Sequence, residues 1–180
     1  MKSAEKFIQR TRSKLTHKCN LAMLDLLARY PRKQVAEFEG KQFLDFGEES
    51  GGLLLPLPRR SAKPRFDCAD EMVEFYDAFD GLRESDPGCC GHFVSCREVC
   101  PLWQLSSYVV KDEPKASLRV IFVALNGDLM TMNSQGAFQW HRLHDGSFSR
   151  YAPDFAAFLT KYIRFRSKQD GFPFDSFGRC

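Results

Sequence analysis

The stretch that decides the fold covers residues 119–141 and reads RVIFVALNGDLMTMNSQGAFQWH. Its first part is rich in Val, Ile and Phe and predicts a buried strand. The dipeptide Asn126-Gly127 is a strong hairpin signal, and residues 133–136 predict a second turn. The stretch therefore predicts an antiparallel meander. Its three expected strands are Arg119–Leu125, Leu129–Met132 and Ala137–Leu143.

An amphipathic helix is predicted on each side of this meander. The first covers Asp70–Asp80 and is followed by a glycine that suits a C-cap. Met72, Tyr76 and Phe79 recur there at helical spacing and form its apolar face. The second helix begins at Pro153, because proline suits the first helical position. Its apolar face consists of Phe155, Phe158, Leu159, Tyr162 and Ile163.

The first sixty residues are predicted to form a helical extension and a linker. Residues 4–30 predict one helix that ends before Pro31, with apolar residues on one face and Lys and Arg over much of the rest. The same basic bias is also typical of an organelle transit peptide and of a nucleic-acid-binding arm. Val35–Phe46 predicts a strand or a hairpin. The segment that follows, with two glycines, three leucines and several prolines, predicts turns and loops, and a domain boundary is expected near residues 58–65.

The composition of the 180-residue chain, with 43% hydrophobic and 27% charged residues, is typical of one soluble globular domain. Its 17 phenylalanines predict a core built on large rings. The apolar runs are too short to cross a membrane. The chain does not begin with the pattern of a secretory signal, and its seven cysteines are an odd number, so reduced thiols and a cytoplasmic location are expected.

The net charge of +3 conceals an uneven distribution. Residues 1–34 carry nine Lys/Arg and two Asp/Glu (+7), residues 35–110 carry seven and 14 (−7), and residues 111–180 carry ten and seven (+3). Residues 67–86 alone hold eight acids and one arginine. This acidic segment has two interpretations: an ordinary solvated helix face, or a docking surface for a basic protein such as a nuclease-like toxin.

The stretch GCCGHFVSCREVC, residues 88–100, contains four of the seven cysteines. As a zinc site it would supply Cys90, His92, Cys96 and Cys100, but it lacks the paired CxxC turns that usually deliver zinc ligands. It also lacks the CxxC of a disulfide-exchange centre. The favoured interpretation is a strand and turn in which cysteine is a compact apolar residue. No metal and no cofactor are therefore expected, and zinc is kept as the alternative.

A second group of candidates for acid–base or metal chemistry stands near the hairpin ends. Two histidines three residues apart on a strand point to opposite faces, and both aspartates stand beside glycine in turns. The chain also lacks the GxSxG, P-loop, HExxH and Rossmann patterns. An assembled catalytic site is therefore not predicted. The residues of this group are Asp128, His141, His144 and Asp145.

Four segments together resemble the SUKH superfamily, which includes a fungal regulator of cell-wall assembly and many bacterial immunity proteins. The matching features are a helix running into Asp-Gly, a short strand before a turn, a strand pair around Asn-Gly-Asp, a third strand ending in His-Asp, and a final helix. The match covers about residues 66–164. The segments are EMVEFYDAFDGLRE (71–84), GHFVSCREVCPLWQL (91–105), RVIFVALNGDLMTMNSQGAFQWHRLHD (119–145) and YAPDFAAFLTKYI (151–163).

The resemblance implies an α+β fold in which helices pack an antiparallel or mixed sheet. It divides the chain into an N-terminal extension and linker (1–60), a SUKH-like domain (61–166) and an irregular tail (167–180). The family shares no catalytic site and requires no metal. A non-enzymatic protein-binding domain is therefore expected, such as an immunity protein that neutralises a cognate toxin by stoichiometric binding. The alternatives are a regulatory or scaffold protein that docks through the basic helix, and a zinc-binding or nucleic-acid-binding protein.

The expected partner-binding residues are four acids that a basic toxin domain would contact. Trp103 and Trp140 are candidate apolar anchors, although core packing is the stronger interpretation for both. Neither a membrane nor a nucleic acid is favoured as the partner. The four acids are Asp70, Glu74, Asp77 and Glu84.

Overall fold

The computed structural model describes residues 2–30, 33–38, 41–47, 53–56, 64–84, 91–105, 117–124 and 126–168. Four α-helices, one short 3-10 helix and nine strands lie within these ranges. The helices are α1 (Lys2–Arg12), α2 (Lys18–Arg29), α3 (Asp70–Phe79), η2 (Leu102–Gln104) and α5 (Phe155–Lys168). The strands are β1 (Gln34–Phe38), β2 (Lys41–Asp45), β3 (Leu53–Pro56), β4 (Arg83–Glu84), β5 (Gly91–Phe93), β6 (Arg119–Ala124), β7 (Leu129–Met132), β8 (Phe138–His141) and β9 (Phe148–Ala152).

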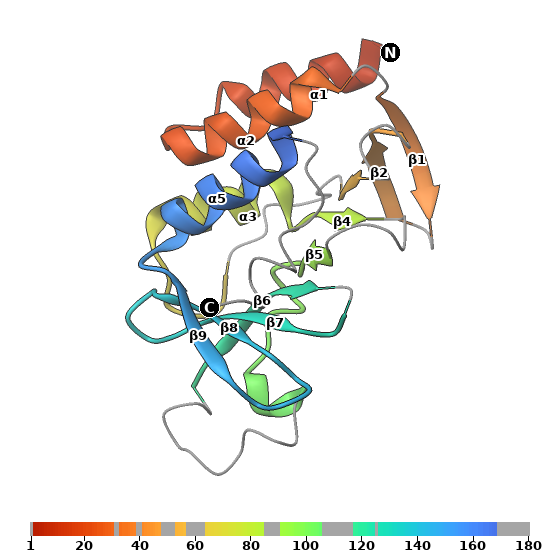
Figure 1. The fold of residues 1–180 in the computed structure, drawn as a ribbon. Helices are drawn as coiled ribbons and strands as arrows, with labels where there is room; N and C mark the ends of the chain where they lie inside the picture. The colour runs from red at the N-terminus through yellow and green to blue at the C-terminus, as the bar shows by residue number, and fades with distance from the viewer. Residues whose placement is uncertain are drawn as a thin grey trace.

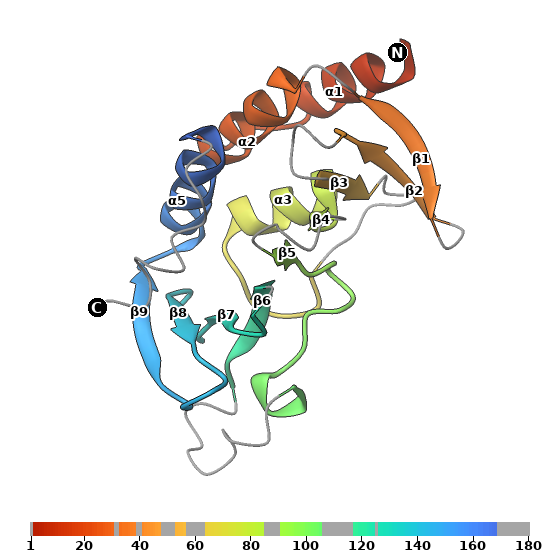
Figure 2. The same ribbon diagram turned by 45° about the vertical axis from the view of Figure 1, so that its right-hand side comes forward.

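The strands form two antiparallel sheets, ordered β1-β2-β3-β4 and β5-β6-β7-β8-β9. The sheets meet where Leu82 bridges Phe93, and the Leu82 N–H donates to the Phe93 carbonyl at 3.2 Å. Figure 1 shows β4 beside β5 at this junction. In Figures 1 and 2 the helices α1, α2, α3 and α5 all lie on the same side of the five-stranded sheet. The expected α+β class is confirmed.

The predicted meander is present, and it is longer than the sequence indicated. The Gly127 N–H donates to the Ala124 carbonyl at 3.0 Å and closes the expected β6–β7 hairpin. The strand β9 was not predicted; it follows a turn at Asp145-Gly146 and pairs antiparallel with β8. The final helix therefore begins only after this additional strand.

The main core lies between the five-stranded sheet and the helices, and aromatic rings fill it. Phe93 of β5 contacts Phe75 of α3 at 5.2 Å between ring centroids and Tyr162 of α5 at 4.9 Å. Phe138 of β8 stacks on Phe158 of α5 at 4.7 Å. The prediction of a core built on large rings is confirmed. A smaller core of Leu102, Leu118, Val120 and Leu129 is separate from it.

The single helix predicted over residues 4–30 is wrong, because the structure has two helices with a turn at residues 13–17. The Ser13 hydroxyl donates to the Arg10 carbonyl at 2.9 Å at the end of α1. Leu15 is buried in the turn itself. The turn allows α2 to reverse and pack against both α3 and α5. Both N-terminal helices contribute residues to the main core.

Residues 33–56 carry more strand than the sequence indicated. The predicted hairpin over Val35–Phe46 is confirmed as β1 and β2. The three leucines after it were assigned to a loop, but they form β3, which pairs Leu55 with Leu44. Most of the expected domain boundary near residues 58–65, namely residues 58–63, lies outside the described residues. Of the expected irregular tail, Ser167 and Lys168 belong to α5, and residues 169–180 lie outside the described residues.

Gly91 allows the closest backbone approach between β5 and β6. Its φ is +120°, and a Cβ there would lie 2.1 Å from the Val123 carbonyl oxygen. Gly91→Ala is therefore expected to lower the free energy of unfolding by about 3 kcal/mol or more, because the cost of a positive φ adds to the cost of the overlap between the new Cβ and the Val123 carbonyl. Gly136, with φ +78° and no atom within 4 Å, is the matched control, and Gly136→Ala should cost about 1–2 kcal/mol. Equal losses in urea denaturation of the two variants would contradict this explanation.

Candidate partner-binding surface

Glu74 of α3 holds the start of α2 in place. Its Oε2 accepts hydrogen bonds from the Thr16 N–H at 2.8 Å and from the Thr16 hydroxyl. Its Oε1 accepts from the His17 N–H at 3.0 Å and from the Asn20 amide at 2.9 Å. The helix α2 has no acidic residue in its first turn and no side-chain cap of its own. Glu74 therefore supplies the negative charge that a helix N-terminus favours.

The network around Glu74 runs from exposed Thr16 at the surface to Asn20 inside the molecule. Asn20 is fully buried, and its amide also donates to the Glu71 carbonyl at 2.8 Å. Burial alone would raise the pKa of Glu74, but the hydrogen bonds from Thr16, Asn20 and His17 outweigh it and lower the pKa from 4.5 to about 2. Both carboxylate oxygens of Glu74 accept hydrogen bonds from the start of α2, so its first role is structural, and its part in binding a partner stays a prediction.

The other predicted acids have different positions. Asp70 is the first residue of α3 and is exposed, together with Asp67 in the preceding segment. Asp77 lies two turns further along α3 and is partly buried. Glu84 belongs to β4, and its side chain lies outside the described residues. The outer acidic surface available for a partner is therefore centred on Asp67 and Asp70, with Asp77 on the same helix.

The proposed zinc ligands are only partly described. Cys90 lies outside the described residues, and His92, Cys96 and Cys100 do not form a group that could hold a metal. The Cys96 side chain is buried in the main core, and its N–H donates to the Asp80 carboxylate at 3.0 Å. Burial, with Asp80 nearby, raises the pKa of the Cys96 thiol to about 11. The thiol is therefore protonated at neutral pH and packs as an apolar group.

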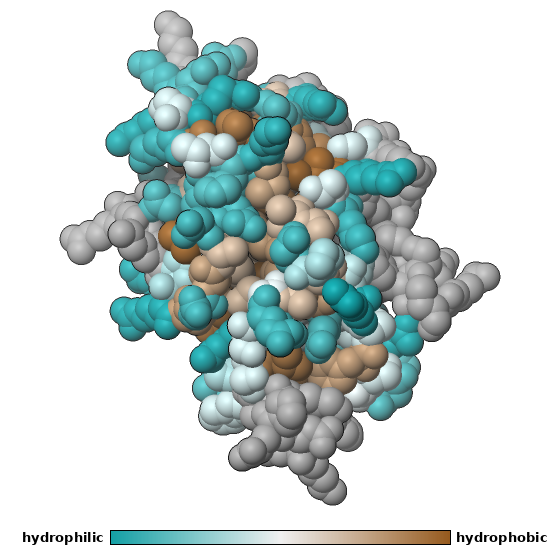
Figure 3. Space-filling model, turned by 90° about the vertical axis from the view of Figure 1, so that its left-hand side faces the viewer, coloured by the Kyte–Doolittle hydropathy of each residue, from teal (hydrophilic) through white to brown (hydrophobic). Residues whose placement is uncertain are grey.

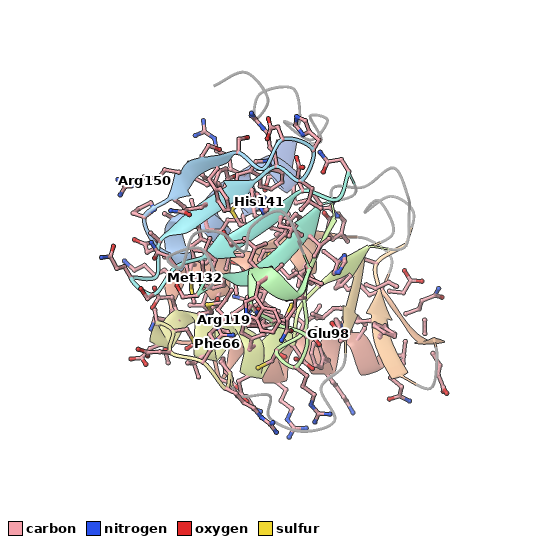
Figure 4. The ribbon with its side chains drawn as sticks, turned by 90° about the horizontal axis from the view of Figure 1, so that it is seen from below. Phe66, Glu98, Arg119, Met132, His141 and Arg150 are labelled. Carbon is pink, nitrogen blue, oxygen red and sulfur yellow. The ribbon has the colours of Figure 1, made fainter. Side chains whose placement is uncertain are left out.

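The acid–base candidates near the hairpin ends occupy separate environments. His141 is buried and stacks on Phe148 at 4.3 Å between centroids, whereas His144 lies at the surface 3.3 Å from Asp145. Figure 4 shows His141 within the sheet and Arg150 at its edge, pointing away. The Asp128 carboxylate accepts a hydrogen bond from the Leu143 N–H at 3.1 Å. This bond joins the residue before β7 to the segment that follows β8. The two histidines are thus not brought together.

The two tryptophans have opposite environments, which the sequence did not distinguish. Trp140 on β8 is 2% exposed and belongs to the main core. Trp103 on η2 is 49% exposed, and Leu105, two residues further along the chain, is 52% exposed. Val35 is the only other exposed large hydrophobic side chain within the described ranges. Core packing is therefore right for Trp140 and wrong for Trp103.

The short helix η2 is firmly attached to the sheet. The Leu102 N–H donates to the Leu118 carbonyl at 2.8 Å, and Pro101 bridges Arg119 of β6. The Leu102 side chain is fully buried in the smaller core. The Leu105 N–H closes the turn onto the Leu102 carbonyl at 3.0 Å. Trp103 and Leu105, which we call the apolar knob, are therefore exposed on a well-anchored support.

The chain matches no protein-family model, no curated protein and no solved structure. Among the described helices, none is long and apolar enough to cross a lipid bilayer.

Proposed function

We propose that this chain is a non-enzymatic protein-binding domain that neutralises a toxin by stoichiometric capture. The observation that carries the proposal is the apolar knob of Trp103 and Leu105, exposed on an anchored turn. Tryptophan is enriched among the few interface residues that supply most of the binding energy. A side chain on a pre-organised support also loses less conformational entropy on binding.

The acidic surface supplies the charge complementarity in this proposal. Asp67 and Asp70 are exposed, and they belong to the segment that holds eight acids and one arginine. Carboxylates of this kind steer a basic partner toward the complex and increase the association rate more than the affinity. The partner is therefore a protein with a basic surface, and the resemblance to immunity proteins makes a toxin domain the expected class.

Trp103→Ala is expected to weaken binding of the partner by at least about 2 kcal/mol, or about 30-fold in Kd, because it removes the central anchor. Isothermal titration calorimetry with the purified partner measures the change. Gln104→Ala, an exposed neighbour on the same short helix, is the control and should leave Kd within about threefold. Equal affinities for the wild type and the Trp103 variant would remove the apolar knob from the interface.

A further inference from the structure

The outer face of the α1–α2 hairpin is strongly basic. On α1, Lys6 and Arg10 lie opposite the buried stripe of Ala4, Ile8 and Thr11. They are four residues apart, which is about 6 Å along a helix. Lys14 follows in the turn, and Lys18 and Arg29 mark the exposed side of α2. We call Lys6, Arg10, Lys14, Lys18 and Arg29 the cationic face.

The positive charge of this face is not neutralised within the described part of the chain. None of its five residues forms an ion pair there, and the two helices contain only two acids, Glu5 and Asp25. Asp25 is already paired with Arg12, and this pair joins α2 to α1. Within the described part of α1 and α2, the cationic face therefore carries five positive charges, and Glu5 is the one acid of the two helices that has no ion pair there.

The apolar residues of the same helices are turned inward. Ile8 and Leu15 belong to the main core, as do Met23, Leu24 and Leu27 of α2. The exposed large hydrophobic residues described for the chain, Val35, Trp103 and Leu105, all lie outside α1 and α2. Hydrophilic residues predominate in the upper part of Figure 3, the level at which Figure 1 places the two helices. A ligand of this face would therefore be held by charge and hydrogen bonds alone.

We propose that the cationic face binds nucleic acid through its phosphate backbone. Phosphate contacts from Lys and Arg suffice for sequence-independent binding, with no apolar insertion. A membrane surface is disfavoured because an interfacial helix buries an apolar face among the lipids, and here that face is used by the core. This site is distinct from the apolar knob and goes beyond the proposed function.

The test uses the full-length chain, a fluorescent duplex DNA of mixed sequence and a single-stranded RNA, measured by anisotropy over a range of salt. The wild type should bind with Kd on the order of 10⁻⁴–10⁻⁶ M at physiological salt. For the duplex, log Kobs should fall against log salt with a slope of about −4 to −5, as five phosphate contacts require. Phosphatidylserine vesicles form the second arm of the experiment.

The charge-reversal variant combines Lys6→Glu with Lys14→Glu. Both side chains are exposed, so the core is not disturbed. The first change also places an acid four residues before Arg10, which is a favourable pair on a helix and should preserve α1. The affinity of this variant for the duplex should fall at least about tenfold, and the salt slope should weaken by about 2. Arg97→Glu with Arg150→Glu makes the same charge change at exposed sites elsewhere and should keep the wild-type slope. Binding to vesicles but not to either nucleic acid, or equal losses in both double variants, would overturn the proposal.

Discussion

Removal of residues 1–34 is expected to abolish cooperative folding of the chain. The segment carries six large buried apolar side chains, Ile8, Leu15, Met23, Leu24, Leu26 and Leu27. Full burial of one such side chain contributes about 1.5–3 kcal/mol, so the six contribute about 9–18 kcal/mol. A whole domain has a free energy of unfolding of only about 5–15 kcal/mol. The helix α2 also covers α3 and α5, whose apolar faces would become exposed.

The dispersion of amide signals in an NMR spectrum of the truncated chain measures this loss directly. Removal of residues 169–180 is the control, because it deletes none of the described core residues. A truncated chain that melts cooperatively like the wild type would contradict the account of the core. A scaffold protein that docks through its basic N-terminal segment should lose its partner when that segment is deleted, but an unfolded chain would lose any partner. Point variants of the cationic face, which leave the core intact, are therefore needed to distinguish a scaffold protein from an immunity protein.

Glu74→Gln is expected to destabilise the chain at neutral pH by about 1–2 kcal/mol, because the hydrogen bonds that lower the pKa of Glu74 favour its charged form in the folded state, and solvent at exposed Thr16 screens part of that gain. The direction in pH follows from that lowered pKa. The contribution of Glu74 is fully present above about pH 4.5 and is lost as the pH falls toward 2, because protonation removes the charge that its donors stabilise.

Urea denaturation at several pH values measures this effect in the wild type, in Glu74→Gln and in the control Asp67→Asn. Asp67 is exposed, so its replacement should change the free energy of unfolding by less than about 0.5 kcal/mol. The difference between wild type and Glu74→Gln should shrink between pH 4.5 and 2. A constant difference over that range would show that the carboxylate charge is not what holds α2.

Local sequence signals predicted the meander and the helix α3 because the structure there is decided by neighbouring residues. Asn126-Gly127 specifies a hairpin wherever it stands between two apolar runs. Met72, Tyr76 and Phe79 mark a buried helical stripe by their spacing alone, and all three are fully buried. The strand β9 also had a local signal, the Asp145-Gly146 turn ahead of Phe148, and could have been found in the same way.

Other features depend on contacts between residues distant in sequence, which no local pattern contains. The break between α1 and α2 is held by Glu74, 58 residues beyond Thr16. In the sequence Glu74 is one of several evenly spaced acids, and only the folded chain distinguishes it from exposed Asp70. The strand β3 depends on its pairing with β2. The exposure of Trp103 follows from the burial of its neighbour Leu102.

Stoichiometric capture of a protein by this chain can be tested by native mass spectrometry of the chain purified gently from its own host. One spectrum weighs both bound protein and bound metal. We expect a one-to-one complex with a single basic protein, present at the wild-type level in Gln104→Ala and clearly reduced in Trp103→Ala. A chain that carries no protein but a zinc ion, removed by a chelator, would contradict this expectation.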